Sequence, residues 1–173
     1  MKFKKIITVL MTMIILLSNL MITNVSMAYT GEKVKVQTNT ELNDYIIYDG
    51  APARFIYVFY INEKGEEYPA FCVQGDVPGV EATEEKSYEV TASGTLKDEQ
   101  IWRIIHKSYP YVSMSEMGCS DKYECYVATK AALDCILNNR DVNKYAATNI
   151  ERVDNIRTIN KLVYYANETS IEP

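Results

Sequence analysis

The sequence predicts an α+β fold, in which a β-rich N-terminal half, arranged as a sheet or a barrel, packs against a helical C-terminal half. Between residues 33 and 92, short runs rich in Val, Ile, Tyr and Phe alternate with turn residues, as is typical of strands. After Gly94, apolar residues recur at intervals of three and four, as is typical of helices. Residues 29–173 are enough for one domain with a buried core, and two domains would be crowded.

The chain begins with the pattern of an export signal. Lys2, Lys4 and Lys5 precede an apolar run over residues 6–17, and small residues at 26–28 form a cleavage pattern. We therefore expect residues 1–28 to be a cleaved signal peptide and the protein to be secreted. The alternative, an uncleaved membrane anchor, requires about 20 apolar residues, and polar side chains interrupt the sequence after Leu17.

The charge of the remaining chain argues against nucleic acid and anionic membranes as partners. The signal holds three of the 18 basic residues and none of the 23 acidic ones, which leaves 15 basic residues against 23 acidic residues. Phosphate binding depends on clustered Lys and Arg, so we expect no nucleic-acid partner and no membrane contact after signal cleavage. The C-terminus carries no Leu-Pro-x-Thr-Gly signal for attachment to a cell wall.

Five strands are predicted in the N-terminal half. They are Lys33–Gln37, Tyr45–Tyr48, Arg54–Ile61, Tyr68–Gln74 and Tyr88–Ala92. The sequence Asn62-Glu63-Lys64-Gly65 predicts a hairpin turn between the third and the fourth. Because the third strand is apolar on both faces, we expect it to be central to its sheet.

Three helices are predicted in the C-terminal half. The first covers Lys97–Lys107 and is closed by Tyr109-Pro110, because the residue before proline disfavours helix. The second begins at Ser120 or Asp121, with Glu124 supporting its first turn, and ends near Asn138. The third runs from about Asn149 to Ala166.

Cys72 is the residue on which the function depends. It follows an aromatic residue in the strand-like run from Tyr68 to Gln74, and the nearest other cysteine is Cys119. In an exported protein such a cysteine has three options, namely a disulfide, an exposed reactive thiol, or a covalent bond to a second side chain.

Three short motifs together resemble a known family. Phe71-Cys72-Val73, the run from Gln100 to Tyr111, and Ala128-Thr129-Lys130-Ala131-Ala132-Leu133 follow one another at the spacing of a bacterial thioester domain. This module, also called TQXA, lies at the tips of Gram-positive surface adhesins and pili. The resemblance extends over about Val34 to Ala166, nearly the whole exported chain.

The resemblance implies a function. In the family, an aromatic-Cys motif supplies a sulfur and a helical Thr-Gln-x-Ala motif supplies a glutamine that condenses with it, releasing ammonia. A nucleophile on the host can then attack the thioester and become attached. The resemblance therefore implies a non-enzymatic adhesion module for a host cell-surface or matrix protein, with no cofactor. We expect its working surface to surround Cys72 and the turn Tyr109-Pro110-Tyr111.

The sequence departs from the family at the decisive position. Aligning Thr129 and Ala132 with the motif places Lys130 where glutamine should be, and lysine has no carbonyl with which to form a thioester. Gln74 is too near Cys72 for a suitable loop, and Gln100 reaches it only if the architecture differs. We therefore predict that an intact Cys-Gln thioester is absent.

Two interpretations of Lys130 remain open. In one, its ammonium lies beside Cys72 and keeps the sulfur nucleophilic, or oxidation links the two side chains. In the other, Lys130 is a solvated helix lysine.

The other cysteines have fewer options. Cys125 and Cys135 are ten positions apart on one predicted helix, about 15 Å of rise, which is too far for a disulfide. A Cys119–Cys125 disulfide, or a bridge from another element to Cys72, is geometrically plausible. Cys135 is also explained as a small buried apolar residue. No spacing of Cys and His predicts a metal site.

The sequence also leaves two other interpretations of the chain open. Cys72 and His106 formally provide the pair of a cysteine-dependent hydrolase or transferase, but nothing in the sequence predicts an oxyanion hole or an orienting third group. A histidine beside Lys107 at a helix end is also explained by the helix dipole. A third interpretation is that the chain is a truncated form of a longer surface protein, because members of the family usually continue into stalk domains and a wall anchor.

Overall fold

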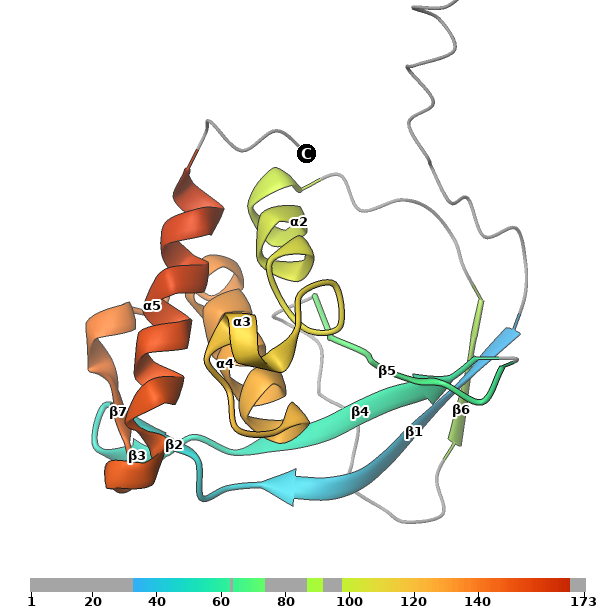
Figure 1. Cartoon of the computed structure of the whole chain (residues 1–173), viewed down its shortest axis with the longest axis horizontal. Helices are drawn as coiled ribbons and strands as arrows, with labels where there is room; N and C mark the ends of the chain where they lie inside the picture. Colours follow the sequence, from blue (N-terminus) through green and yellow to red (C-terminus); the bar gives the residue numbers. More distant parts are fainter. Residues whose placement is uncertain (1–32, 63, 74–86, 92–97, 169–173) are drawn as a thin grey trace, which may run out of the picture.

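The structure is a computed structural model, and it describes residues 33–62, 64–73, 87–91 and 98–168 (Figure 1). The predicted signal peptide, residues 1–28, and Gln74 lie outside the described residues. Within those ranges, no helix is both long enough and apolar enough to cross a membrane. The mixed α+β class is confirmed, with a sheet-rich N-terminal half and a mainly helical C-terminal half.

The strands form two antiparallel sheets. The larger has the order β5-β4-β1-β6, and the smaller has the order β3-β2-β7. The strands of the larger sheet are β1 (Lys33–Leu42), β4 (Phe55–Ile61), β5 (Glu67–Pro69) and β6 (Ser87–Thr91). The smaller sheet contains β2 (Ile46–Tyr48), β3 (Ala51–Pro52) and β7 (Tyr145–Ala147).

Strand β4 is central, as its two apolar faces predict. It pairs with β1 on one side and with β5 on the other. Phe55, Tyr57 and Phe59 are buried, whereas the residues between them are half-buried. The hairpin to β5 also forms at the predicted place, where Gly65 has a φ of 81° and donates its N–H to the Asn62 carbonyl over 3.0 Å.

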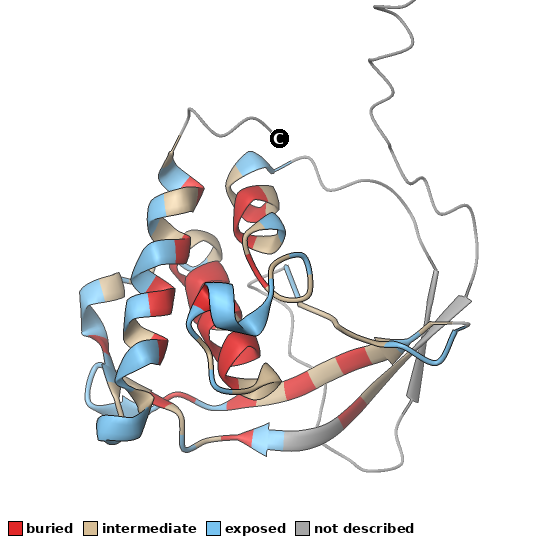
Figure 2. Cartoon of the chain, in the orientation of Figure 1, coloured by how far each residue is buried: buried red, intermediate tan, exposed pale blue. Residues whose placement is uncertain are grey.

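The helices gather on one side of the larger sheet (Figure 1). They are α2 (Glu99–His106), α3 (Met114–Met117), α4 (Lys122–Leu137) and α5 (Val153–Asn167). Two 3₁₀ turns, Val142–Lys144 and Ile150–Arg152, flank β7 in the chain. Helix α4 packs against α2, α5 and β4, and its residues from Glu124 to Thr129 and from Ala131 to Cys135 are all buried (Figure 2). It therefore forms the centre of the core.

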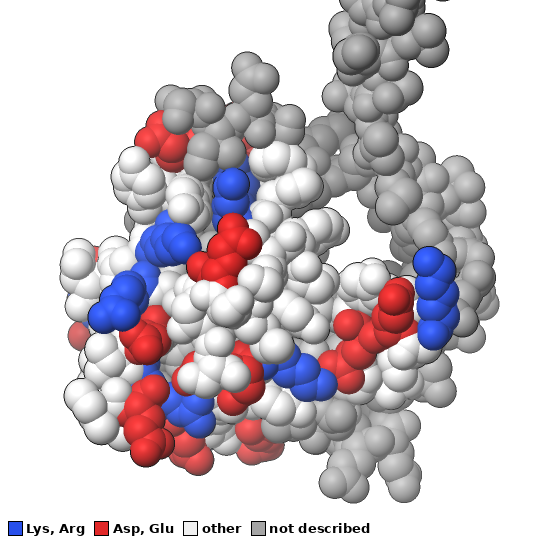
Figure 3. Space-filling model, viewed as in Figure 1, with Lys and Arg blue, Asp and Glu red and all other residues white. Residues whose placement is uncertain are grey.

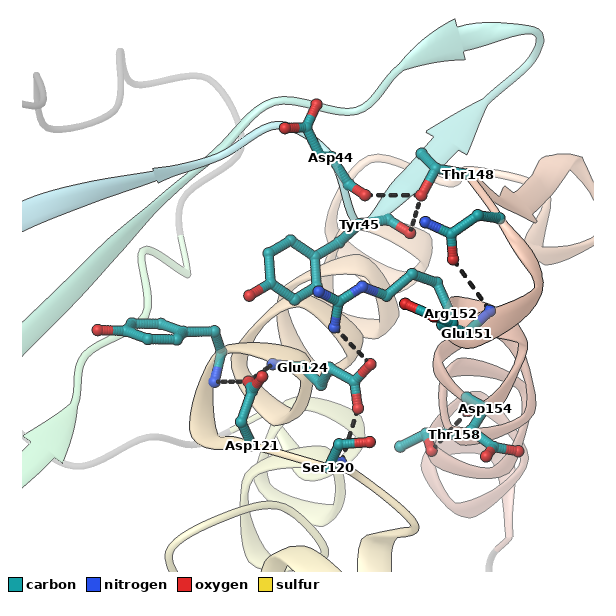
Figure 4. Close-up of polar contacts among 12 residues, drawn as sticks. Asp44, Tyr45, Ser120, Asp121, Glu124, Thr148, Glu151, Arg152, Asp154 and Thr158 are labelled. Carbon is teal, nitrogen blue, oxygen red and sulfur yellow. Dashed lines mark hydrogen bonds and ion pairs between the residues drawn. The ribbon is translucent and has the colours of Figure 1, made fainter.

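The first turn of α4 is held by a buried carboxylate. Asp121 caps the helix by accepting the N–H groups of Tyr123 and Glu124, both over 2.8 Å. Glu124 in turn accepts the Ser120 N–H over 2.7 Å and a guanidinium hydrogen of Arg152 over 2.7 Å (Figure 4). This arrangement is a variant of the capping box, in which the carboxylate accepts the N–H of the residue before the cap and not that of the cap itself.

The charge of Glu124 is stabilised although only 1% of its side chain is exposed. Burial alone would raise its pKa, but the Ser120 backbone hydrogen bond and Arg152 outweigh burial, so the pKa lies below the ordinary 4.5. The Arg152 guanidinium also lies over the Tyr45 ring, 4.1 Å from its centroid (Figure 4). This network joins the start of α4 to α5 and to the chain before β2.

Three predicted boundaries are wrong. The fourth strand, predicted to reach Gln74, ends at Pro69, so Cys72 lies beyond the strand. Proline has no N–H for the ladder, and after one further bond from the Ala70 N–H to the Val58 carbonyl the chain leaves the sheet. The first strand continues to Leu42. The last helix begins at Val153, after a 3₁₀ turn.

We expect Glu124→Gln to lower the free energy of unfolding at pH 7 by about 1–3 kcal/mol, because it weakens charged hydrogen bonds at a buried position. Chemical denaturation should show this decrement against the wild type. The exposed pair between Lys144 and Asp49 provides the control, and Asp49→Asn should change stability by less than about 0.5 kcal/mol.

The decrement should also depend on pH. Because folding lowers the Glu124 pKa, the stabilisation is present above its ordinary value of 4.5 and is lost as the pH falls through the folded-state pKa. Wild type and Glu124→Gln should therefore begin to converge as the pH falls below 4.5 and should meet only below the folded-state pKa. A decrement of the same size at both ends of the pH range would contradict this role for the carboxylate.

Candidate functional site

The candidate site is the chain from Ala70 to Cys72, which passes from the sheet onto helix α4. Three residues of α4, each one turn after the last, contact β5 and this segment: Lys122, Tyr126 and Lys130. We call these three residues the α4 stripe. Residues four positions apart lie on one face of a helix, so the stripe faces the segment along about 12 Å of the helix.

The first member of the stripe binds β5. The Lys122 ammonium donates to a carboxylate oxygen of Glu67 over 2.6 Å, and the buried Tyr57 hydroxyl donates to the same oxygen over 2.7 Å. Burial would raise the pKa of Glu67, but the hydrogen bonds from Lys122 and Tyr57 lower it below its ordinary value. Glu67 is therefore held as a carboxylate between the sheet and the start of α4.

The other two members bind the backbone of the segment. The Tyr126 hydroxyl donates to the Ala70 carbonyl over 3.3 Å, and the Lys130 ammonium donates to the Cys72 carbonyl over 3.1 Å. The carbonyls of Ala70 and Cys72, two residues apart in an extended chain, point the same way. The distance between them along the chain is close to the rise of one helical turn, which separates Tyr126 from Lys130. Helix α4 thus holds the segment by its main chain and leaves the Cys72 residue exposed.

Aromatic rings fill the space beneath the segment. The Phe71 ring stacks on Tyr126 with centroids 4.9 Å apart, and Tyr126 meets Tyr57 edge to face at 4.9 Å. Burial raises the pKa of Tyr126 and outweighs the lowering effect of the Val58 backbone, so the phenol remains a hydrogen-bond donor. The buried residues form two hydrophobic clusters, one between the sheet and α4 and one among the helices. Phe71 packs against both clusters and so lies at the junction between sheet and helices.

The structure brings the predicted residues Phe71, Cys72 and Lys130 together. Thr129 and Ala132 are buried, and the Thr129 hydroxyl donates to the Cys125 carbonyl over 2.8 Å. These two residues therefore form the core side of α4, next to the stripe. The roles assigned to the five residues by resemblance stay predictions.

Sequence reasoning missed Tyr126 and Lys122. The only signal for them is their position four and eight residues before Lys130, which places them on the same face of the predicted helix. That signal is usable only once a strand is known to lie beside this face.

Two other residues considered for bonds to Cys72 have different contacts. The Gln100 amide donates to the Asn167 side-chain oxygen over 2.9 Å and so joins α2 to α5. The His106 ring stacks between Trp102 and Tyr111, with centroids at 4.1 Å and 4.9 Å. This is an exposed aromatic column, and it does not resemble a base oriented toward a thiol.

The described residues contain no group of three or more His, Cys, Asp or Glu side chains arranged to hold a metal ion. Cys135 is buried in the core, where burial raises the pKa of its thiol to about 11. This position fits the interpretation of Cys135 as a small apolar residue.

Comparison with known proteins gives one family. The family model described as "TED: Thioester domain" matches residues 69–168, well over half of the chain. No curated protein matches the chain.

Two solved structures have the same fold. "The Bacillus anthracis TIE protein" is similar with a TM-score of 0.59 at 19% identity, and the match covers 82% of this chain and 25% of that protein. "Thioester domain of the Enterococcus faecium TIE86 protein" is similar with a TM-score of 0.54 at 14% identity, covering 83% of this chain and 55% of that one. The chain thus spans about a quarter of the first structure and about half of the second.

We expect Tyr126→Phe to destabilise the protein by about 0.5–1.5 kcal/mol, because the ring stays while the hydrogen bond to Ala70 is lost. Tyr126→Ala should cost about 3–5 kcal/mol, because it also removes the contact with Phe71. Chemical denaturation measures both. The exposed Tyr164 is the matched control, and Tyr164→Phe should change little. Equal effects of Tyr126→Phe and Tyr164→Phe would show that the Tyr126 hydroxyl does not hold the segment.

Proposed function

Because the chain belongs to the thioester-domain family, we propose that it is a secreted bacterial adhesion module that binds a host cell-surface or matrix protein without an intact Cys-Gln thioester. The observation that carries the proposal is the contact between Lys130 and Cys72. The side chain at the position of the motif glutamine reaches the cysteine, but it ends in an amine 3.1 Å from the backbone carbonyl.

The chemistry of Lys130 excludes it as the acyl partner. A thioester forms when the cysteine sulfur replaces the nitrogen of a glutamine carboxamide and ammonia leaves. Lysine offers no carbonyl carbon for this exchange. Its ammonium instead donates a hydrogen bond to the Cys72 main chain, and this bond holds the segment against α4.

In the absence of a thioester, binding rests on contacts at the surface. The three stacked rings of Trp102, His106 and Tyr111 present rigid aromatic area, and the Tyr111 residue is 65% exposed. Rigid aromatic side chains are frequent anchors in protein interfaces because they bury large areas at little entropic cost.

Charge gives little guidance toward a partner. Figure 3 shows Lys and Arg mixed with Asp and Glu over the face in view, with uncharged surface between them. A surface of this kind favours shape and aromatic contact over steering by a field of one sign. These features support a protein partner that is recognised by packing.

We expect methylamine to leave the mass of the exported protein unchanged, because no activated carbonyl is present at Cys72. Intact-mass spectrometry before and after incubation makes the measurement. Addition of one amine with the appearance of a new thiol would contradict the proposal.

Lys130→Gln is the complementary variant. It supplies the missing carboxamide, so in a pocket that otherwise fits the family it should produce a species lighter by one ammonia and sensitive to methylamine. Lys130→Met, which has no carboxamide, is the control and should give neither result.

We expect Tyr111→Ala to weaken binding to host cells or matrix at least tenfold, in the range of an interface anchor, without lowering thermal stability. Tyr164→Ala is the matched control, since Tyr164 is 62% exposed but lies on α5. Equal binding of the two variants would place the contact surface elsewhere. Hydrolysis of esters or peptides that is lost in both Cys72→Ala and His106→Ala would favour the enzyme alternative.

A further inference from the structure

Cys119 and Cys125 lie just before and within the first turns of α4, and the Cys119 thiol is the group that acts most strongly on the Cys125 thiol. Both pack in the core cluster formed by α2, α4 and α5. Cys125 is fully buried, whereas Cys119 is half-buried. Neither thiol contributes to the contacts around Cys72 described above.

Backbone hydrogen bonds hold the chain on both sides of Cys119. Helix α3 ends at Gly118, whose φ of 88° lies in the left-handed region, and the Cys119 N–H bonds back to the Met114 carbonyl over 2.9 Å. Downstream, Glu124 holds the Ser120 N–H. Cys119 is thus fixed three residues before the helix and packs against the core cluster that contains Cys125, much as a hydrophobic staple pairs residues across a helix start.

We propose that Cys119 and Cys125 form a disulfide that staples the α3–α4 connection to α4. The oxidant is a disulfide of low molecular mass, such as oxidised glutathione. The Cys119 thiolate attacks one sulfur of the oxidant and releases one thiol. The Cys125 sulfur then attacks Cys119, releases the second thiol and leaves the intramolecular disulfide, and the two protein thiols lose two protons and two electrons in total.

The environments of the two sulfurs fit this order of attack. The hydrogen bond with Cys119 and burial raise the pKa of Cys125 well above its ordinary value, so Cys125 stays a thiol while Cys119 is unmodified. Cys119 is also the one that solvent reaches. Once Cys119 carries the oxidant, Cys125 is the adjacent resolving thiol.

The staple acts on the element that positions the candidate site. It would close a loop containing Ser120 and Asp121, the residues that cap α4 and hold Glu124. The disulfide therefore fixes the start of α4, the helix whose α4 stripe binds the Cys72 segment. The inference rests on the Cys119–Cys125 geometry and does not depend on the adhesion proposal.

Peptide mapping tests the pairing directly. Trypsin cleaves after Lys122, between the two cysteines, so a Cys119–Cys125 disulfide keeps residues 108–122 and 123–130 joined. After incubation of the folded protein with oxidised glutathione, we expect this joined pair, lighter by two hydrogens than the two peptides and separated by reduction. Cys72→Ser and Cys135→Ser should retain it, and Cys119→Ser should lose it.

Thermal unfolding provides the second measurement. The oxidised wild type should unfold roughly 5 °C or more above the reduced protein, and Cys119→Ser should show no such shift. Recovery of Cys119 and Cys125 as separately alkylated peptides after oxidation, or of a bond from either one to Cys72 or Cys135, would overturn the proposal. A joined pair without a change in melting temperature would overturn the stapling role.

Discussion

The position of Cys72 depends on one contact, the packing of the α4 stripe along β5 and the segment that follows it. Lys122 binds Glu67, Tyr126 binds the Ala70 carbonyl, and Lys130 binds the Cys72 carbonyl. Three helix residues spaced one turn apart thus hold the chain as it leaves the sheet. The stripe can do this only because α4 is itself immobilised, with its opposite side buried and its first turn held by Glu124 and Arg152.

The sequence aligns Lys130 with the motif glutamine of the thioester-domain family, whose fold this chain has. The side chain at position 130 still connects helix to segment, but through a hydrogen bond to the main chain. Under our proposal, the position of the segment is kept while the acyl partner of the thioester is missing. Such a module would keep an ordered surface near Cys72 and would bind through contacts such as the aromatic column ending at Tyr111.

The sequence predicts the fold class, the central strand and the buried helix because each has a strong hydrophobic period. It does not predict the end of β5, because the residues after Pro69 are as apolar as a strand. The contacts that hold them on α4 instead, such as the stacking of Phe71 on Tyr126, are tertiary. It also misses α3 and β7, which are too short to show a period. Tyr126 belongs to the site through a tertiary contact, which no local pattern encodes.

The isotopically resolved mass of the exported protein, purified without reductant or amine and then denatured, tests most directly whether Cys72 carries a thioester. We expect the mass of the sequence after signal cleavage, or that mass less the two hydrogens of one disulfide, with Cys72 recovered as a peptide carrying no link to a glutamine. A mass lower by one ammonia, with Cys72 joined to a glutamine peptide, would show an intact thioester and contradict the central claim.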